Sequence, residues 1–154
     1  MALKYILQVK TEVSLLNFIE IYLNKKTVLF SKGKINKGIN INLYEVLGFM
    51  FSFTFSEKVF FDYLIDENKV VEENWDYSSD IHFRLDKFYD NLLARLNMIE
   101  VCVYILNNTK EDIRLLFNGD ILVLERTNGI ISINKNFGFW NTSDLLGQIK
   151  MIVL

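Results

Sequence analysis

The sequence has very few of the residues on which most metal and nucleophilic sites depend. It contains one cysteine, one histidine and no proline in 154 residues. One cysteine excludes a disulfide framework within the chain and any cysteine-rich zinc site. One histidine excludes the His-Glu-x-x-His motif and every site built on a pair of histidines. No linker rich in glycine, serine or proline divides the chain, so the length predicts a single domain over residues 1–154.

The motifs of common enzyme classes are also missing. The seven glycines fall singly, and no phosphate-binding Gly-Lys-Ser/Thr loop or Gly-x-Ser-x-Gly nucleophile turn occurs. The acidic spacing around Asp62, Asp66 and Glu67 does not match a calcium loop. We therefore predict no catalytic residue, no cofactor and no metal site, and we expect a protein that is not an enzyme.

Two possible pairings of His82 keep a catalytic alternative open. His82 is the sole imidazole, and Asp86 lies four residues further on, where the two could meet on one face of a helix. Cys102 could form a thiolate pair with His82 only if the fold brought them together. The simpler interpretation is a boundary histidine with a local hydrogen bond and a buried, inert thiol.

Membrane and nucleic-acid classes have little support. The longest apolar zone, residues 46–55, is far shorter than the roughly 20 residues that span a bilayer. The first residues lack the pattern of a signal peptide, so we expect a cytoplasmic protein without a membrane partner. The formal net charge is −2, whereas nucleic-acid binding usually requires a strong basic excess.

The periodicity of apolar residues predicts three helices. The first opens at Thr11 and ends in the lysines at 25 and 26, and a second is capped by Ser78-Ser79-Asp80. Its apolar stripe runs from Ile81 to Leu96 at spacings of three and four. A terminal helix begins at Thr142 or Ser143.

Strands are predicted by alternating or continuous apolar runs. Asn118 and Asn128, each followed by glycine, predict hairpin turns in a meander over residues 113–133. Residues 58–65 fit a helix or a strand equally. The remaining predicted strands are Leu3–Val9, Thr27–Ser31, Ile39–Leu43, Phe49–Phe55 and Met98–Leu106. The fold class that follows is α+β, a largely antiparallel sheet with two or three helices packed on it.

The distribution of charge carries the functional hint. Residues 57–90 hold ten acidic and four basic residues, whereas residues 1–56 carry a net positive charge. Within the acidic part, a segment interpreted as a loop joins carboxylates to two large aromatic residues. Such a composition is typical of a protein-binding surface, although Trp75 could instead pack into the core. The candidate partner-binding residues are Glu72, Glu73, Trp75, Asp76, Tyr77 and Asp80.

A small acidic protein of this kind, with many residues encoded by AT-rich codons and with the segment Glu72–Asp80, resembles the bacterial toxin-immunity proteins, including those of contact-dependent growth inhibition systems. The resemblance implies a tight complex with a cognate toxin, often a nuclease, whose active site or substrate surface is blocked. The carboxylates would stand in for substrate phosphates. The expected partner is therefore a basic protein toxin, bound through an acidic surface.

Two other functions stay open at this point. The aromatic ladder Phe49–Phe55 could line a pocket for a small apolar ligand, although such a ladder is more often core. The apolar excess could also reflect a buried interface between copies in a structural or assembly subunit, so a homo-oligomer remains open. The cluster Phe137-Gly138-Phe139-Trp140 is expected to close the core between the sheet and the last helix.

Overall fold

A computed structural model describes residues 3–11, 14–36, 38–66 and 68–150, with only the backbone described at 55–62 and 72–78. The elements found in these ranges are, in chain order, β1 (Lys4–Val9), α1 (Leu16–Lys25), β2 (Lys32–Ile35), β3 (Gly38–Leu43), β4 (Phe49–Asp66), β5 (Lys69–Leu85), α2 (Asn91–Asn108), β6 (Ile113–Phe117), β7 (Ile121–Thr127), β8 (Ile130–Ile133), a short 3₁₀ helix η1 (Gly138–Asn141) and α3 (Ser143–Lys150).

The strands form one sheet in the order β2-β3-β4-β5-β1-β6-β7-β8. Every neighbouring pair in this order is antiparallel. One additional parallel bridge joins Leu64 of β4 to Ile121 of β7. The α+β class with a largely antiparallel sheet and three helices is thus confirmed.

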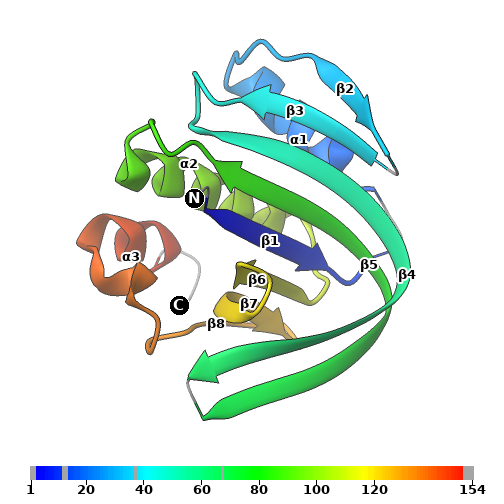
Figure 1. Ribbon diagram of the computed structural model, residues 1–154, viewed down its shortest axis with the longest axis vertical. Helices are drawn as coiled ribbons and strands as arrows, with labels where there is room; N and C mark the ends of the chain where they lie inside the picture. The colour runs from blue at the N-terminus through cyan, green and yellow to red at the C-terminus, as the bar shows by residue number, and fades with distance from the viewer. Residues whose placement is uncertain (1–2, 12–13, 37, 67, 151–154) are drawn as a thin grey trace.

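A long hairpin of β4 and β5 dominates the architecture. The two strands contain 18 and 17 residues and keep one register from Phe49↔Leu85 to Leu64↔Val70. Figure 1 shows the hairpin as an arc that curves around β1 and β6–β8, and β4 pairs with β7 near the tip of this arc, at Leu64. We call the half beyond residues 55 and 79 the arm. Residues 58–65, which fitted a helix or a strand equally, belong to the arm as strand.

The core lies between one face of this sheet and the helices. Alternate residues of each central strand point to the same face, and on β4 these are Phe49, Phe51 and Phe53, all buried. The rings of Phe49 and Phe51 pack against Phe83 of β5 with centroids 5.4 and 5.2 Å apart. These strands share one hydrophobic cluster with α1, α2, η1 and α3.

The aromatic cluster that follows the last strand closes this core, as the sequence predicts. Phe139 and Trp140 are buried in η1, directly before α3. The indole Nε1 of Trp140 donates a hydrogen bond of 2.8 Å to the carbonyl oxygen of Val123 in β7. The bond satisfies the indole N–H and ties η1 to the sheet.

The two predicted hairpin turns are confirmed by the backbone. Asn118 and Gly119 have φ of 52° and 85°, and Asn128 and Gly129 have φ of 50° and 82°. Two successive positive φ values define the turn that matches the right-handed twist of the flanking strands. The meander β6–β7–β8 therefore follows from the local sequence.

The second helix does not begin where the sequence predicts. The expected cap at Ser78-Ser79-Asp80 lies inside β5, and α2 begins eleven residues after Asp80, at Asn91. Its cap is Asp90, whose carboxylate accepts a hydrogen bond of 2.8 Å from the backbone N–H of Leu93. The predicted helix over residues 81–96 is wrong over residues 81–90 and confirmed over residues 91–96.

The reason is an ambiguity of spacing. The interval of four between Ile81 and Leu85 fits two strand periods as well as one helical turn. Phe83, midway between them, is also buried, and it pairs with Tyr5 of β1 and Phe51 of β4. Residues 81–85 form a strand because they pair with β1 on one side and β4 on the other, and a single sequence does not reveal this pairing.

Two other strand predictions are wrong. Met98–Leu106 is the second half of α2, because a continuous apolar run does not distinguish a buried strand from a buried helix. Thr27–Ser31 is irregular, and Leu29 is exposed. The strand of this region is β2, which begins at Lys32. The first helix is shorter than predicted, because α1 begins at Leu16.

Among the residues that the structure describes, no helix is both long enough and apolar enough to cross a membrane.

The position of the aromatic ladder predicts a large loss of stability on truncation. Phe51→Ala should lower the free energy of unfolding by about 3–5 kcal/mol, since it leaves a cavity in the core. The side chain of Phe88 is 86% exposed, so Phe88→Ala should change it by no more than about 0.5 kcal/mol. Urea denaturation followed by circular dichroism measures both. Equal losses in the two variants would contradict this core.

Candidate functional site

The acidic segment lies on a strand and not, as the sequence suggests, on a loop before a helix. Residues 72–80 are part of β5 and pair with β4 along the arm. The register sets Trp75 opposite Val59 and Glu72 opposite Asp62. Glu72, Glu73, Trp75, Asp76 and Tyr77 have side chains outside the described residues, so whether Trp75 enters the core stays a prediction. The segment is a regular, extended part of the sheet.

The tip of the arm is fixed to the sheet it curves around. The ring of Tyr63 lies 4.8 Å from the guanidinium carbon of Arg114, and its hydroxyl donates to Oε2 of Glu125 at 3.4 Å. Arg114 donates to the same oxygen at 3.4 Å. The backbone N–H of Leu64 donates to the carbonyl oxygen of Asp120. The acidic segment is therefore held at the tip of the arm and again at the central sheet.

This contact is largely shielded from water. Arg114 is only 3% exposed, and Tyr63 is buried with Leu116 and Leu122. Burial raises the pKa of the Tyr63 hydroxyl; Arg114 opposes this rise, and the charge of Glu125 adds to it. Tyr63 thus keeps its proton and remains the donor in the hydrogen bond to Glu125.

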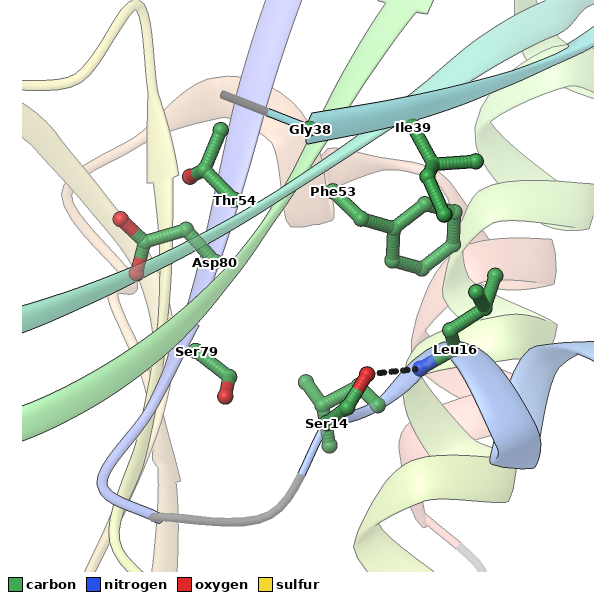
Figure 2. Close-up of a pocket in the computed structure, with 9 residues that line it drawn as sticks. Ser14, Leu16, Gly38, Ile39, Phe53, Thr54, Ser79 and Asp80 are labelled. Carbon is green, nitrogen blue, oxygen red and sulfur yellow. Dashed lines mark hydrogen bonds between the residues drawn. The ribbon is translucent and has the colours of Figure 1, made fainter. Parts of the chain in front are cut away.

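Asp80 is the one predicted partner-binding residue whose side chain is described. It is half-buried and pairs with Thr54 on β4 and Gln8 on β1. It lines a cavity of about 160 Å³ between the sheet and the start of α1. Figure 2 shows Phe53 turned toward Leu16, with Asp80 and Thr54 on the other side of the strands. Asp80 sits at the root of the arm, apart from its tip.

The hypothesis of a ligand site on the aromatic ladder finds no support in the described side chains. Phe49 and Phe51 are fully buried against each other and against Phe83. Phe53 reaches the cavity of about 160 Å³, and the side chain of Phe55 lies outside the described residues. The described part of the ladder, Phe49, Phe51 and Phe53, is core, as the simpler interpretation held.

A larger pocket of about 570 Å³ lies elsewhere, on the outer face of β1, β4 and β5. We use outer face for the side of these strands that points away from the core, whose residues alternate with the buried ones. Asn118, from the turn between β6 and β7, closes one side of the pocket, and none of its lining residues comes from a helix. Its principal lining residues on the strands are Lys4, Ile6, Met50, Ser52, His82 and Arg84.

His82 lies in this pocket, between Ile6 of β1 and Ser52 of β4. Burial lowers the pKa of its imidazole, Asp80 opposes that effect, and Lys4 adds to it. The predicted partner Asp86 does not share a helix face with it, since His82 lies on a strand. Asp86 instead accepts a hydrogen bond of 3.0 Å from the backbone N–H of Phe88.

Cys102 and His82 lie on different sides of the sheet. Cys102 is on α2 in the main core, and burial strongly raises the pKa of its thiol. His82 faces outward between buried Ile81 and Phe83. The thiol is buried, as the simpler interpretation expected, and the fold does not form the Cys–His pair. Within the described ranges, no three His, Cys, Asp or Glu residues gather as metal ligands would.

Sequence reasoning missed the pair of cations at this pocket. The signal was present as alternation, because exposed Lys4 and half-buried Ile6 alternate with buried Tyr5 and Leu7 on β1. Arg84 and His82 alternate in the same way on β5. Interpreting residues 81–85 as a helix concealed that alternation and placed His82 and Arg84 on the wrong kind of element.

Comparison with known proteins assigns the chain to a class. A family model described as SitI3-like matches residues 3–144, from the start of β1 into α3. SitI family members are toxin immunity proteins, which is the class that the sequence resembles. Within that class, the chain belongs to the SitI3-like family. No curated protein and no solved structure matches it.

The charges around His82 predict that two variants shift the pKa of its imidazole in opposite directions. Asp80→Asn should lower the pKa of His82, because a negative charge that favours the imidazolium is removed. Lys4→Gln should raise it, because a repelling positive charge is removed. His82 is the only histidine in the chain, so a pH titration by NMR gives its pKa without assignment. An unchanged pKa in both variants would show that these groups do not face the ring.

The burial of Cys102 predicts protection from thiol reagents. At pH 8 the folded protein should react with Ellman's reagent at least about a hundredfold more slowly than the urea-unfolded protein, because opening of the core must precede attack. Absorbance at 412 nm follows the reaction. Equal rates in the folded and unfolded protein would contradict a buried thiol.

Proposed function

We propose that the protein neutralises a cognate toxin by forming a tight complex with it, and that the toxin is a basic domain, a nuclease or similar, of the contact-dependent growth inhibition type. The observation that carries the proposal is the SitI3-like family match over residues 3–144. An inhibitor of this kind acts by occupying its target's surface and needs no catalytic residue. It needs only a surface that complements the target in shape and charge.

The acidic segment on β5 is the proposed contact surface, formed by Glu72, Glu73, Trp75, Asp76, Tyr77 and Asp80. The register sets the acidic positions 62 and 72 opposite each other across the hairpin. Like charges in directly opposed positions repel, so a cationic partner would be stabilising there. The net negative charge of residues 57–90 also favours a cationic partner.

The anchoring of the arm supports this role through pre-organisation. A segment that is already extended and fixed at both ends loses little conformational entropy on binding. The contacts of Tyr63 with Arg114 and Glu125 hold the tip, and the pairing of Asp80 with Gln8 and Thr54 holds the root. The segment can therefore present its residues to a toxin without folding first.

The direct experiment is co-expression of this protein with the toxin encoded beside its gene. Growth should be restored, and affinity-tagged protein should retain the toxin in a 1:1 complex at 0.15 M salt. A toxin that kills equally with and without this protein, and that is not retained, would overturn the proposed function.

The acidic surface is tested by charge reversal. The variant E72K/E73K/D76K should associate with the toxin at least about tenfold more slowly at low salt, because electrostatic steering is reversed. Stopped-flow fluorescence at two salt concentrations measures the association rate. The melting temperature reports whether the fold is retained.

The matched control reverses three exposed acidic residues elsewhere, in E45K/E111K/D144K, with the same change in net charge. It should associate much faster than the first variant. If the two variants slow association equally, net charge and not the segment determines the rate. An unchanged rate in the first variant at low salt would exclude the acidic segment as the contact.

A further inference from the structure

The outer-face pocket of about 570 Å³ carries a charge opposite to that of the acidic segment. Lys4 and Arg84 are both exposed and stand in directly opposed register on β1 and β5. On its other side Arg84 is paired with Met50 of β4, which is uncharged. The imidazole of His82 lies between these cations and Asp80 along the strand.

Among the side chains that the structure describes, no anion forms an ion pair with either of these cations. Like charges directly opposed across antiparallel strands are destabilising. Within the described part of the chain, neither Lys4 nor Arg84 has an ion-pair partner, whereas Lys26, Lys32 and Arg114 each do. A fold that tolerates such a pair gains free energy when an anion binds between the two groups.

The walls of the pocket indicate the kind of anion. Ile6 and Met50 are half-buried and supply apolar surface beside the cations. Asn118 and Ser52 add neutral hydrogen-bonding groups. A carboxylate on a short aliphatic stem fits this set, since the stem contacts the apolar wall and the two oxygens accept from the cations.

The exposure of the cations distinguishes a protein partner from a small ligand. Sites for small molecules bury most of the ligand and place their polar groups inside the cleft. Here both cations stand at an exposed rim, where charge attracts and orients an approaching surface. An acidic stretch of polypeptide can satisfy both rim cations at once.

We propose that the outer-face pocket binds an acidic segment of a partner protein, with a glutamate or aspartate carboxylate held between Lys4 and Arg84. In taking that partner to be the toxin, the inference rests on the proposed function. The complex would then have two contacts of opposite polarity, which fix the orientation of the partner more strictly than a single acidic patch does.

The test uses a capped hexaglutamate peptide, with capped hexaglutamine as the neutral control. The ring signals of His82 report on the pocket, because no other histidine is present. Bound carboxylates should raise the pKa of His82, since a nearby negative charge favours the imidazolium. Backbone amide shifts on adding the peptide should be confined to β1, β4, β5 and the turn at Asn118.

The variants K4Q and R84Q should each weaken binding of hexaglutamate about tenfold, as expected for the loss of one charge-assisted hydrogen bond. Affinity is taken from the amide shifts, because Lys4→Gln changes the pKa of His82 by itself. The control K34Q/K135Q removes two exposed lysines that do not line the pocket and should bind the peptide like the parent protein.

Three results would overturn the proposal that this pocket binds an acidic segment. They are equal binding of hexaglutamine, unchanged affinity of the variant K4Q/R84Q, or amide shifts that fall outside the outer face in the parent protein. Glutarate that binds as tightly as the peptide would assign the site to small carboxylates and would overturn the assignment to a protein partner. The positions of the amide shifts in the parent protein test the proposal even if a variant fails to fold.

The inference and the proposed function fail separately. If the toxin binds the parent protein and K4Q/R84Q equally well, the pocket is not a toxin contact, although the function stands. If hexaglutamate binds as described but no toxin is retained, the pocket stands and the proposed function is overturned.

Discussion

The long antiparallel pairing of β4 with β5 is the constraint on which the rest of the structure depends. One register runs from Phe49↔Leu85 at the centre of the sheet to Leu64↔Val70 near the tip of the arm. At its root, the pairing aligns the aromatic residues that fill the core. Toward the tip, it forms the arm that curves around the sheet and carries the acidic segment. Because a slip of one residue would turn the apolar residues of one strand away from the face that its partner buries, the core, the outer face and the arm are specified together.

Fixing both ends of the arm holds the acidic segment in one extended shape, as the proposed contact requires. Two-stranded ribbons on their own are marginally stable in water. Here the tip is secured by the shielded contact among Tyr63, Arg114 and Glu125, and by the bridge between Leu64 and Ile121. The chain belongs to the SitI3-like family of toxin immunity proteins, and the proposed function assigns the toxin contact to this arm. The proposed contacts are both places where the register opposes like charges, acidic at positions 62 and 72 and basic at Lys4 and Arg84.

Local sequence was sufficient where the structure depends on neighbours along the chain. The Asn-Gly turns at 118 and 128, the aromatic alternation of Phe49–Phe53 and the final helix were all predicted correctly. It was insufficient where one spacing of apolar residues fitted both a helix and a strand, and where an apolar run had no periodicity at all. Residues 81–85 belong to β5 and residues 98–106 to α2, and in each case long-range pairing or packing made the choice.

The sequence by itself determined the α+β class, the absence of the commonest catalytic motifs, the acidic character of residues 57–90 and the likeness to immunity proteins. These properties depend on composition, turn chemistry and short-range periodicity, which the chain carries whatever its fold. Tertiary structure alone decided that the acidic segment is a strand of an anchored arm, that Cys102 and His82 are on different sides of the sheet, and that Lys4 meets Arg84. Each of these depends on which strands pair and in what register, and that choice is made by burial of the whole core rather than by any local stretch of residues.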